Sequence, residues 1–217
     1  MSDKSNKYGY VGADIPAQSF GNNKGVLNPA EINELVADNK WTQYGQLELI
    51  GTQTVSSAVT SVDFTNLGDY NVHFITTHSF SSATDFGSLA LRVSADNGSS
   101  FKTSSYQYAN QYANVGNFGE QKSTSTDRIR QMTPPNSGSS PFASNGYAYL
   151  YNFLDSSKYS FVTWHSTAVI SFNSSYEGYY GSGVYTVAET HNAFRLLTTN
   201  SSNVDSGTIS LYGIRYS

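Results

Sequence analysis

Along most of this chain, apolar and polar residues alternate with a period of two, which is typical of β-strands with one buried face. The alternation begins near Leu47, after a leader that lacks it. The strands it predicts lie at residues 47–50, 59–64, 70–80, 89–94, 147–153, 159–169, 193–197 and 207–216. We expect the last of them to be held in a sheet, because it is rich in β-formers and chain ends fray unless they are paired.

Turn residues between these strands predict their connections. The run Asp155-Ser156-Ser157-Lys158 separates 147–153 from 159–169 and predicts a hairpin. The run Asp96-Asn97-Gly98 predicts a second hairpin, from 89–94 to a short strand near Phe101.

Two stretches are predicted to be loops because they are poor in aliphatic residues. Residues 102–146 are rich in Ser, Asn, Gln, Gly and Tyr, and prolines at 134, 135 and 141 exclude a central strand there. Residues 174–187 form a second loop rich in Gly and Tyr. About eight strands joined by polar turns predict an all-β fold, a jelly-roll-like antiparallel β-sandwich over residues 47–217.

Residues 1–46 are predicted to form an extended N-terminal arm with one short helix at about 28–38. Asn28 is a suitable N-cap, with Pro29 at the first helical position and Glu31 at the third. The large apolar residues of the arm stand among Gly and Pro without a regular period, so they cannot form a core of their own. They are expected to bind the body, a neighbouring subunit or a docking partner, and these anchors are Tyr8, Tyr10, Ile15, Phe20, Ile32, Leu35 and Trp41.

Composition narrows the class of partner. Aromatic residues make up 14% of the chain and charged residues 13%, and there are 17 Tyr, so amphipathic rings replace a charged surface. A net charge of -4 without a basic cluster argues against nucleic acid as a partner. No apolar run approaches the roughly 20 residues of a membrane span or the core of a signal peptide, so we expect synthesis in the cytoplasm and no membrane insertion.

The residues capable of catalysis or metal binding form no recognisable motif. His73 and His78 lie an odd number of residues apart on one strand and therefore face opposite ways. Glu189 and His191 can share a face, but no further ligand is near them in sequence. Cysteine is absent, and no nucleophile elbow, paired acids or phosphate-binding loop is present. We therefore predict a protein that is not an enzyme and needs no cofactor or metal; Asp96-Asn97-Gly98 lacks the later acidic positions of a calcium loop.

Tyrosine is the residue type that offers the most candidates for recognising a glycan or a neighbouring subunit. A ring with a polar tip can stack on a sugar or pack against a neighbouring subunit while its hydroxyl keeps a hydrogen bond. The two predicted loops carry the candidates for glycan or subunit contact, which are Tyr106, Tyr108, Tyr112, Tyr176, Tyr179 and Tyr180. Sequence alone leaves both kinds of contact open.

The chain resembles small virion structural proteins of tailed phages, particularly those of marine cyanobacteria. In the arm, the resemblance lies in residues 7–12, 23–26, 31–35 and 40–41. In the body it lies in residues 62–67, 89–94 with 96–98, 154–159 and 207–216. It covers most of the chain outside the two Tyr-rich stretches and contains no catalytic signature.

The resemblance implies a non-enzymatic part of the virion that assembles as a homotrimer. The first expectation is an outward-facing β-sandwich that is anchored by its arm to other virion proteins, as a capsid decoration or short fibre. The alternative is the tip module of a tail fibre, which attaches to the host by recognising a surface polysaccharide through the Tyr-rich stretches.

Overall fold

The computed structural model describes residues 47–136, 142–170 and 174–214, together with Ala30, Asn33, Glu34 and Ala37. These four residues are helical and exposed. The remainder of the helix predicted at about 28–38 and all seven predicted anchors lie outside the described residues, so the helix and the docking role of the arm stay predictions. The chain divides into two compact units, of which residues 45–215 form the one described below.

This unit is an all-β structure in which every strand pairing is antiparallel. Its eleven strands are β1 (Leu47–Val55), β2 (Val62–Thr65), β3 (Val72–Ser82), β4 (Leu89–Ser94), β5 (Tyr106–Asn114), β6 (Phe118–Thr126), β7 (Ser144–Tyr151), β8 (Ser160–Ile170), β9 (Ser175–Tyr185), β10 (Ala193–Thr198) and β11 (Val204–Ile214). The strands predicted from the two-residue period are all present, although β7 and β11 each begin three residues earlier than expected.

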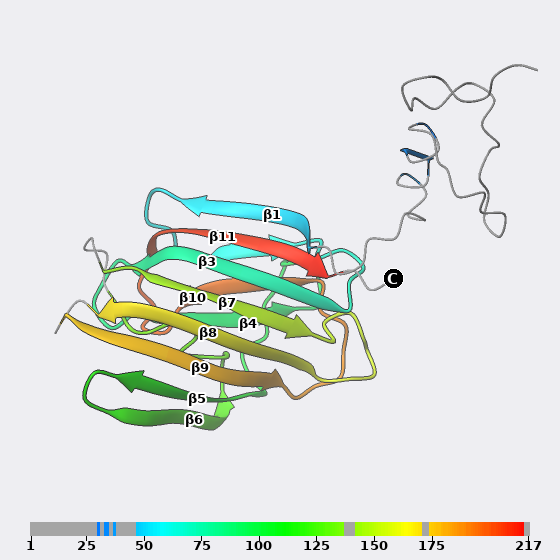
Figure 1. Cartoon of the computed structure of the whole chain (residues 1–217). Helices are drawn as coiled ribbons and strands as arrows, with labels where there is room; N and C mark the ends of the chain where they lie inside the picture. The colour runs from blue at the N-terminus through cyan, green and yellow to red at the C-terminus, as the bar shows by residue number, and fades with distance from the viewer. Residues whose placement is uncertain are drawn as a thin grey trace, which may run out of the picture. The chain divides into compact units, whose positions relative to one another are not determined.

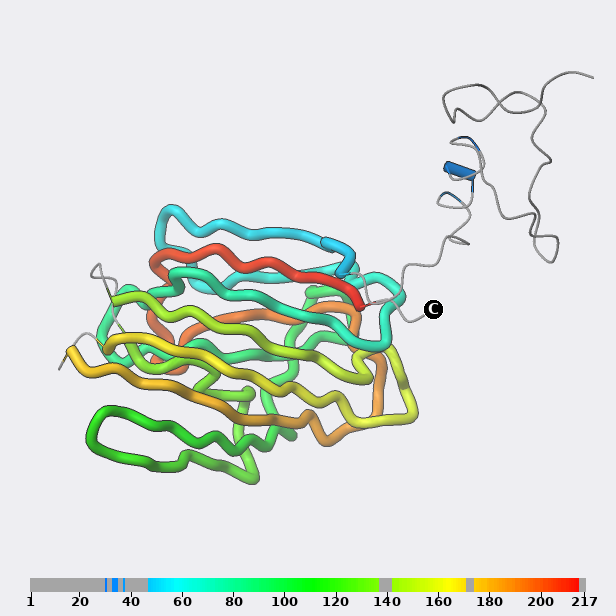
Figure 2. The backbone as a smooth tube through the Cα atoms, viewed as in Figure 1, coloured from blue at the N-terminus to red at the C-terminus, as the bar shows by residue number. Residues whose placement is uncertain are grey.

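The strands form two sheets. The larger has the order β1-β11-β3-β7-β8-β9-β5-β6, and the smaller has the order β2-β10-β4. In Figure 1, β10 and β4 lie behind the strands of the larger sheet. The backbone trace in Figure 2 shows the β5–β6 hairpin at the opposite edge of the larger sheet from β1.

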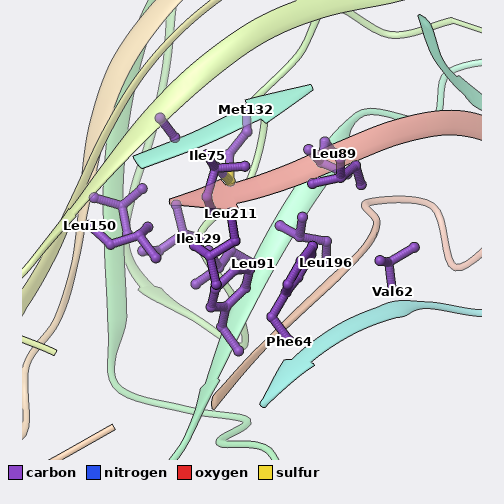
Figure 3. Close-up of a cluster of buried hydrophobic side chains, with 14 of the residues drawn as sticks. Val62, Phe64, Ile75, Leu89, Leu91, Ile129, Met132, Leu150, Leu196 and Leu211 are labelled. Atoms are coloured by element: carbon purple, nitrogen blue, oxygen red, sulfur yellow. The ribbon is translucent and has the colours of Figure 1, made fainter. Parts of the chain in front are cut away.

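The core lies between the two sheets. Figure 3 shows Ile75, Leu150 and Leu211 of the larger sheet together with Leu91, Leu196 and Phe64 of the smaller one. Ile129 and Met132, from the segment after β6, complete this cluster and are almost fully buried. Such burial stabilises the fold by roughly 1.5 to 3 kcal/mol for each large side chain.

The burial pattern of strand β3 shows which face of the larger sheet points to the core. His73, Ile75 and Thr77 are buried, whereas Phe74 on the alternate face is only half-buried. Ser79 has a positive φ of 53°, and the pairing of β3 with β7 shifts register between Thr77 and Phe80. This irregularity places Phe80 in the core, where it is fully buried.

Both Tyr-rich stretches contain strands that the prediction of loops over residues 102–146 and 174–187 missed, namely β5 and β6 with the start of β7 in the first and β9 in the second. Strands β5 and β6 form a hairpin, and β9 pairs with β5 along its length. In these strands, the inward positions of the two-residue period are occupied by residues such as Tyr, Asn and Gln rather than by aliphatic side chains. Glycines at 178, 181 and 183 of β9 leave room for larger neighbours: a Cβ at Gly181 would lie 2.6 Å from the Trp164 ring.

The hairpin predicted between residues 89–94 and Phe101 is wrong. The turn itself is present, with positive φ angles at Asn97 and Gly98 and with Ser100 N donating to Asp96 Oδ1 at 2.8 Å. However, β4 pairs with β10, and the residues around Phe101 are not a strand. By contrast, the hairpin predicted around Asp155 is confirmed as β7 and β8.

Candidate functional site

The face of the larger sheet that points away from the smaller sheet, here called the outer face, carries an unusual number of rings. Alternation along each strand brings one ring after another onto this face. Those on β3, β7 and β11, here called the aromatic bank, are Phe74, Tyr147, Tyr149, Tyr151 and Tyr212.

Rings of the aromatic bank contact one another across the strands. The Phe74 ring centroid lies 4.8 Å from that of Tyr149 and 6.2 Å from that of Tyr212. Tyr147 meets the exposed His165 of β8 edge-on, at 5.8 Å between ring centroids. Solvated sheet faces are normally polar, so this row of rings indicates a contact surface.

Next to the aromatic bank, the outer face is hollowed over β8, β9, β5 and β6. Two adjoining hollows of about 450 Å³ and 340 Å³ share Ala109, Lys122 and Ser182 in their linings. We call them together the outer groove. Ala109 and Ser182 are opposite one another on β5 and β9, and their small side chains leave the sheet surface low at this point.

Some polar groups of the outer groove form hydrogen bonds or ion pairs with one another. The Tyr180 hydroxyl donates to Gln111 Oε1 at 2.6 Å, and Lys122 forms an ion pair with Glu120. The Gln111 NH₂ group is left without a hydrogen bond among the described residues. The groove therefore combines an exposed ring, an uncommitted amide donor and a neutralised pair of charges.

Beneath the groove, a row of side chains crosses the core side of the same strands. Trp164, Gly181, Asn110 and Gln121 are register partners on β8, β9, β5 and β6. Trp164 Nε1, Asn110 Oδ1 and Gln121 Oε1 are buried without a hydrogen-bond partner. The alternation of the strands places these side chains on the core side, and the same four residues also contribute to the lining of the first hollow. Ordered water is the usual partner of such buried groups.

The six tyrosines named from sequence lie on both faces of the larger sheet, some on the core side and some on the outer face. Tyr106 and Tyr179 are 0% and 2% exposed, so neither can offer its ring to a ligand or subunit. Tyr108 and Tyr112 are half-buried on the core side. Tyr176 and Tyr180 are exposed on the outer face, and Tyr180 lines the first hollow of the groove, whereas Tyr108 contributes to the lining of the second. Sequence reasoning missed the aromatic bank, although the alternation at 147, 149 and 151 contained the signal.

A buried polar cluster lies elsewhere in the body, around His191. Ser160 Oγ is 2.8 Å from His191 Nδ1, and His191 Nε2 is 3.5 Å from Glu189 Oε1. Lys102 Nζ contacts both Glu189 oxygens, at 2.9 and 3.0 Å. The order of hydroxyl, imidazole and carboxylate is that of an activated nucleophile, but Ser160 and His191 are 1% and 0% exposed, so a substrate cannot reach them.

Burial lowers the pKa of His191 to about 4, so its imidazole is neutral at pH 7. His73 is also buried, with Nε2 2.9 Å from the Leu67 carbonyl oxygen, and burial lowers its pKa as well. His78 is exposed, on the opposite face of β3 as predicted.

Within the described ranges, no three His, Cys, Asp or Glu side chains lie close enough to hold a metal ion. The same part of the chain contains no helix that is long and apolar enough to cross a membrane.

Comparisons with protein families, with curated proteins and with solved structures found no match. The resemblance to phage virion proteins therefore stays a prediction.

Proposed function

We propose that this chain is a non-enzymatic structural component of a tailed-phage virion, in which residues 1–46 anchor an outward-facing β-body as a capsid decoration or short fibre. We further propose that it assembles as a homotrimer with other virion proteins as its docking partners. Its place of action is the particle, after synthesis in the host cytoplasm.

The observation that carries this proposal is that residues 45–215 form a compact unit with a continuous hydrophobic core. All core residues among those described fall between Val55 and Leu211. The leader, by contrast, carries large apolar side chains without the regular period that a core of their own requires. This supports their use on another surface, as expected of a docking arm.

Strand connectivity supports a jelly roll, an architecture common in viral capsid proteins and lectins. In an eight-stranded jelly roll, the first strand lies beside the last, the last beside the third and the third beside the sixth. The order β1-β11-β3-β7 fits that set, with β5–β6 and β8–β9 as additions that widen the sheet. The order β2-β10-β4 fits the second set, completed by Ile129, whose N–H and carbonyl bond to Leu91.

Deletion of residues 1–46 tests the proposal. Because residues 45–215 form a compact unit, we expect the truncated body to fold and remain soluble but to be absent from purified particles. The measurement is immunoblotting of particles grown with the deletion, with a full-length chain carrying Val115→Ser as the matched control, since Val115 is an exposed hairpin residue. Normal incorporation of the truncated chain would contradict the docking role.

A second candidate function is that of a receptor-binding module, which attaches the particle to a host surface polysaccharide. The observation in its favour is the outer groove, which has Tyr180 exposed at its side. This candidate differs from the first in its contact surface, because it uses the sheet face and not the leader. Adsorption of the purified protein to host cells, and its competition with infection, would test it.

A further inference from the structure

We infer that the outer groove binds a neutral, hydroxyl-rich sugar polymer, with Tyr180 as the ring on which a sugar stacks. The inference rests on the receptor-binding candidate and adds to it a location, a ligand class and a set of residues. It replaces the two Tyr-rich loops of the sequence prediction with the outer face of β5, β6, β8 and β9.

Shape is the first argument. The two hollows adjoin through Ala109, Lys122 and Ser182, so the groove follows β5 from Gln111 to Gln107. Four residues of a strand span about 13 Å, which is longer than a single sugar ring. A groove of this length on a sheet face suits a polymer that lies along it.

Hydrogen-bonding chemistry is the second argument. The hydroxyl of Tyr180 is held by Gln111, which fixes the plane of an exposed ring. The side chains of Gln107 and Ser182 have no hydrogen bonds among the described residues, and neither does the Gln111 NH₂ group. Amides and hydroxyls both donate and accept, and sugar hydroxyls require both.

Charge is the third argument. Glu120 and Lys122 are the two charged residues of the lining in the described ranges, and they form an ion pair with each other. The lining of the described residues thus carries no net charge that would select a phosphate, a sulfate or a uronic acid. The groove therefore favours an uncharged polymer over a charged one.

Affinity electrophoresis of the full-length protein tests the inference, with dextran, laminarin and galactomannan as neutral probes and polygalacturonate as the charged probe. We expect at least one neutral polymer to retard the protein and polygalacturonate not to. Tyr180→Ala should weaken that binding by about tenfold or more, because it removes the stacking ring. Ala109→Trp should abolish binding, because its ring would fill the floor of the groove.

Tyr147→Ala is the matched control, since Tyr147 and Tyr180 are each 43% exposed and flank His165 on the same face. It should keep binding within about twofold. Circular dichroism will show whether each variant retains the native fold. The inference is overturned if no neutral polymer retards the wild type, or if Tyr180→Ala and Ala109→Trp both bind like the wild type.

Adsorption to host cells separates this inference from the function on which it rests. If both groove variants still adsorb like the wild type, the receptor function stands and the groove assignment fails. If the wild type binds a neutral polymer through the groove but does not adsorb to cells, the groove assignment stands and the receptor function fails.

Discussion

At the scale of single residues, the buried histidines couple the stability of the body to pH. His191 is enclosed by Ser160, Glu189 and the rings of Phe153 and Tyr185. Its pKa falls from 6.5 to about 4 because burial penalises the charged imidazolium more than Glu189 favours it. The unfolded chain therefore takes up a proton at a pH where the folded chain does not.

This coupling predicts that the free energy of unfolding falls as pH drops from about 6.5 to 4. In that window the unfolded state binds more protons, and the contribution of His191 is at most about 3 kcal/mol. His73, whose pKa is also lowered by burial, acts in the same direction. Urea denaturation at pH 7 and pH 4.5 measures the loss.

His191→Gln should reduce the difference between the two pH values, since it removes one titrating group. His78→Gln is the control, because His78 is exposed, and it should leave the difference unchanged. An equal pH dependence in the wild type and in His191→Gln would contradict the assignment to His191.

At the scale of elements, Tyr106 joins the two sheets. It projects from β5 of the larger sheet, and its hydroxyl accepts from the Val93 N–H of β4 at 2.9 Å. The same hydroxyl donates to the Lys102 carbonyl at 3.2 Å, and the side chain is fully buried. Because it anchors β5, this tyrosine also fixes the strand that lines the outer groove.

Tyr106→Phe should therefore lower the free energy of unfolding by about 1 to 3 kcal/mol, because it leaves the buried Val93 N–H without a partner. Tyr180→Phe is the matched control: its hydroxyl is exposed and bonded only to Gln111. Chemical denaturation measures both variants. A loss as small for Tyr106→Phe as for Tyr180→Phe would show that the inter-sheet hydrogen bond contributes little.

The strands that were predicted correctly and those that were missed differ in the residues that carry the period. Strands β3, β8 and β10 carry Val, Ile, Leu, Phe or Trp at several inward positions, so their period is visible. In β5, β6 and β9 the inward residues include Tyr, Asn, Gln and Gly, which resemble loop composition. Their burial depends on distant partners such as the segment at Ile129, which local sequence does not reveal.

The candidate site was predicted only in part for the same reason. Tyr180 was named from its residue type, but its position on the outer face follows from the register of β9 with β5 and β8. The hollow itself depends on Ala109 and Ser182 meeting across two strands that are 73 residues apart in sequence, and no motif marks such a meeting.

At the scale of the whole molecule, the outer face supports self-association at the end occupied by β1. Leu47 and Leu49 are 49% and 61% exposed on this edge strand, which contains neither Lys nor Pro. Leu49 is the register partner of Tyr212, so the apolar surface continues into the aromatic bank. Exposed leucines on an edge strand without Lys or Pro favour contact with a second copy of the chain.

We expect light scattering at micromolar concentration to give three times the chain mass of 23.6 kDa. Leu49→Lys should shift the protein toward monomer, because it would place a charge in the contact surface. Val115→Lys, at an exposed hairpin residue outside this edge, should leave the assembly intact. A monomeric wild type would rule out the homotrimer.

The pairing of β1 with β11 has a consequence for how the protein is made. Among the described strands, β11 is the sole neighbour of β1, and Thr52 meets Ser210 across 158 residues of chain. During translation, β1 leaves the ribosome long before β11 has been synthesised. One edge of β3 also stays unpaired until β11 is present. The larger sheet is therefore completed only after nearly the whole body has been synthesised, and a nascent chain interrupted before Val204 leaves two strand edges open to aggregation.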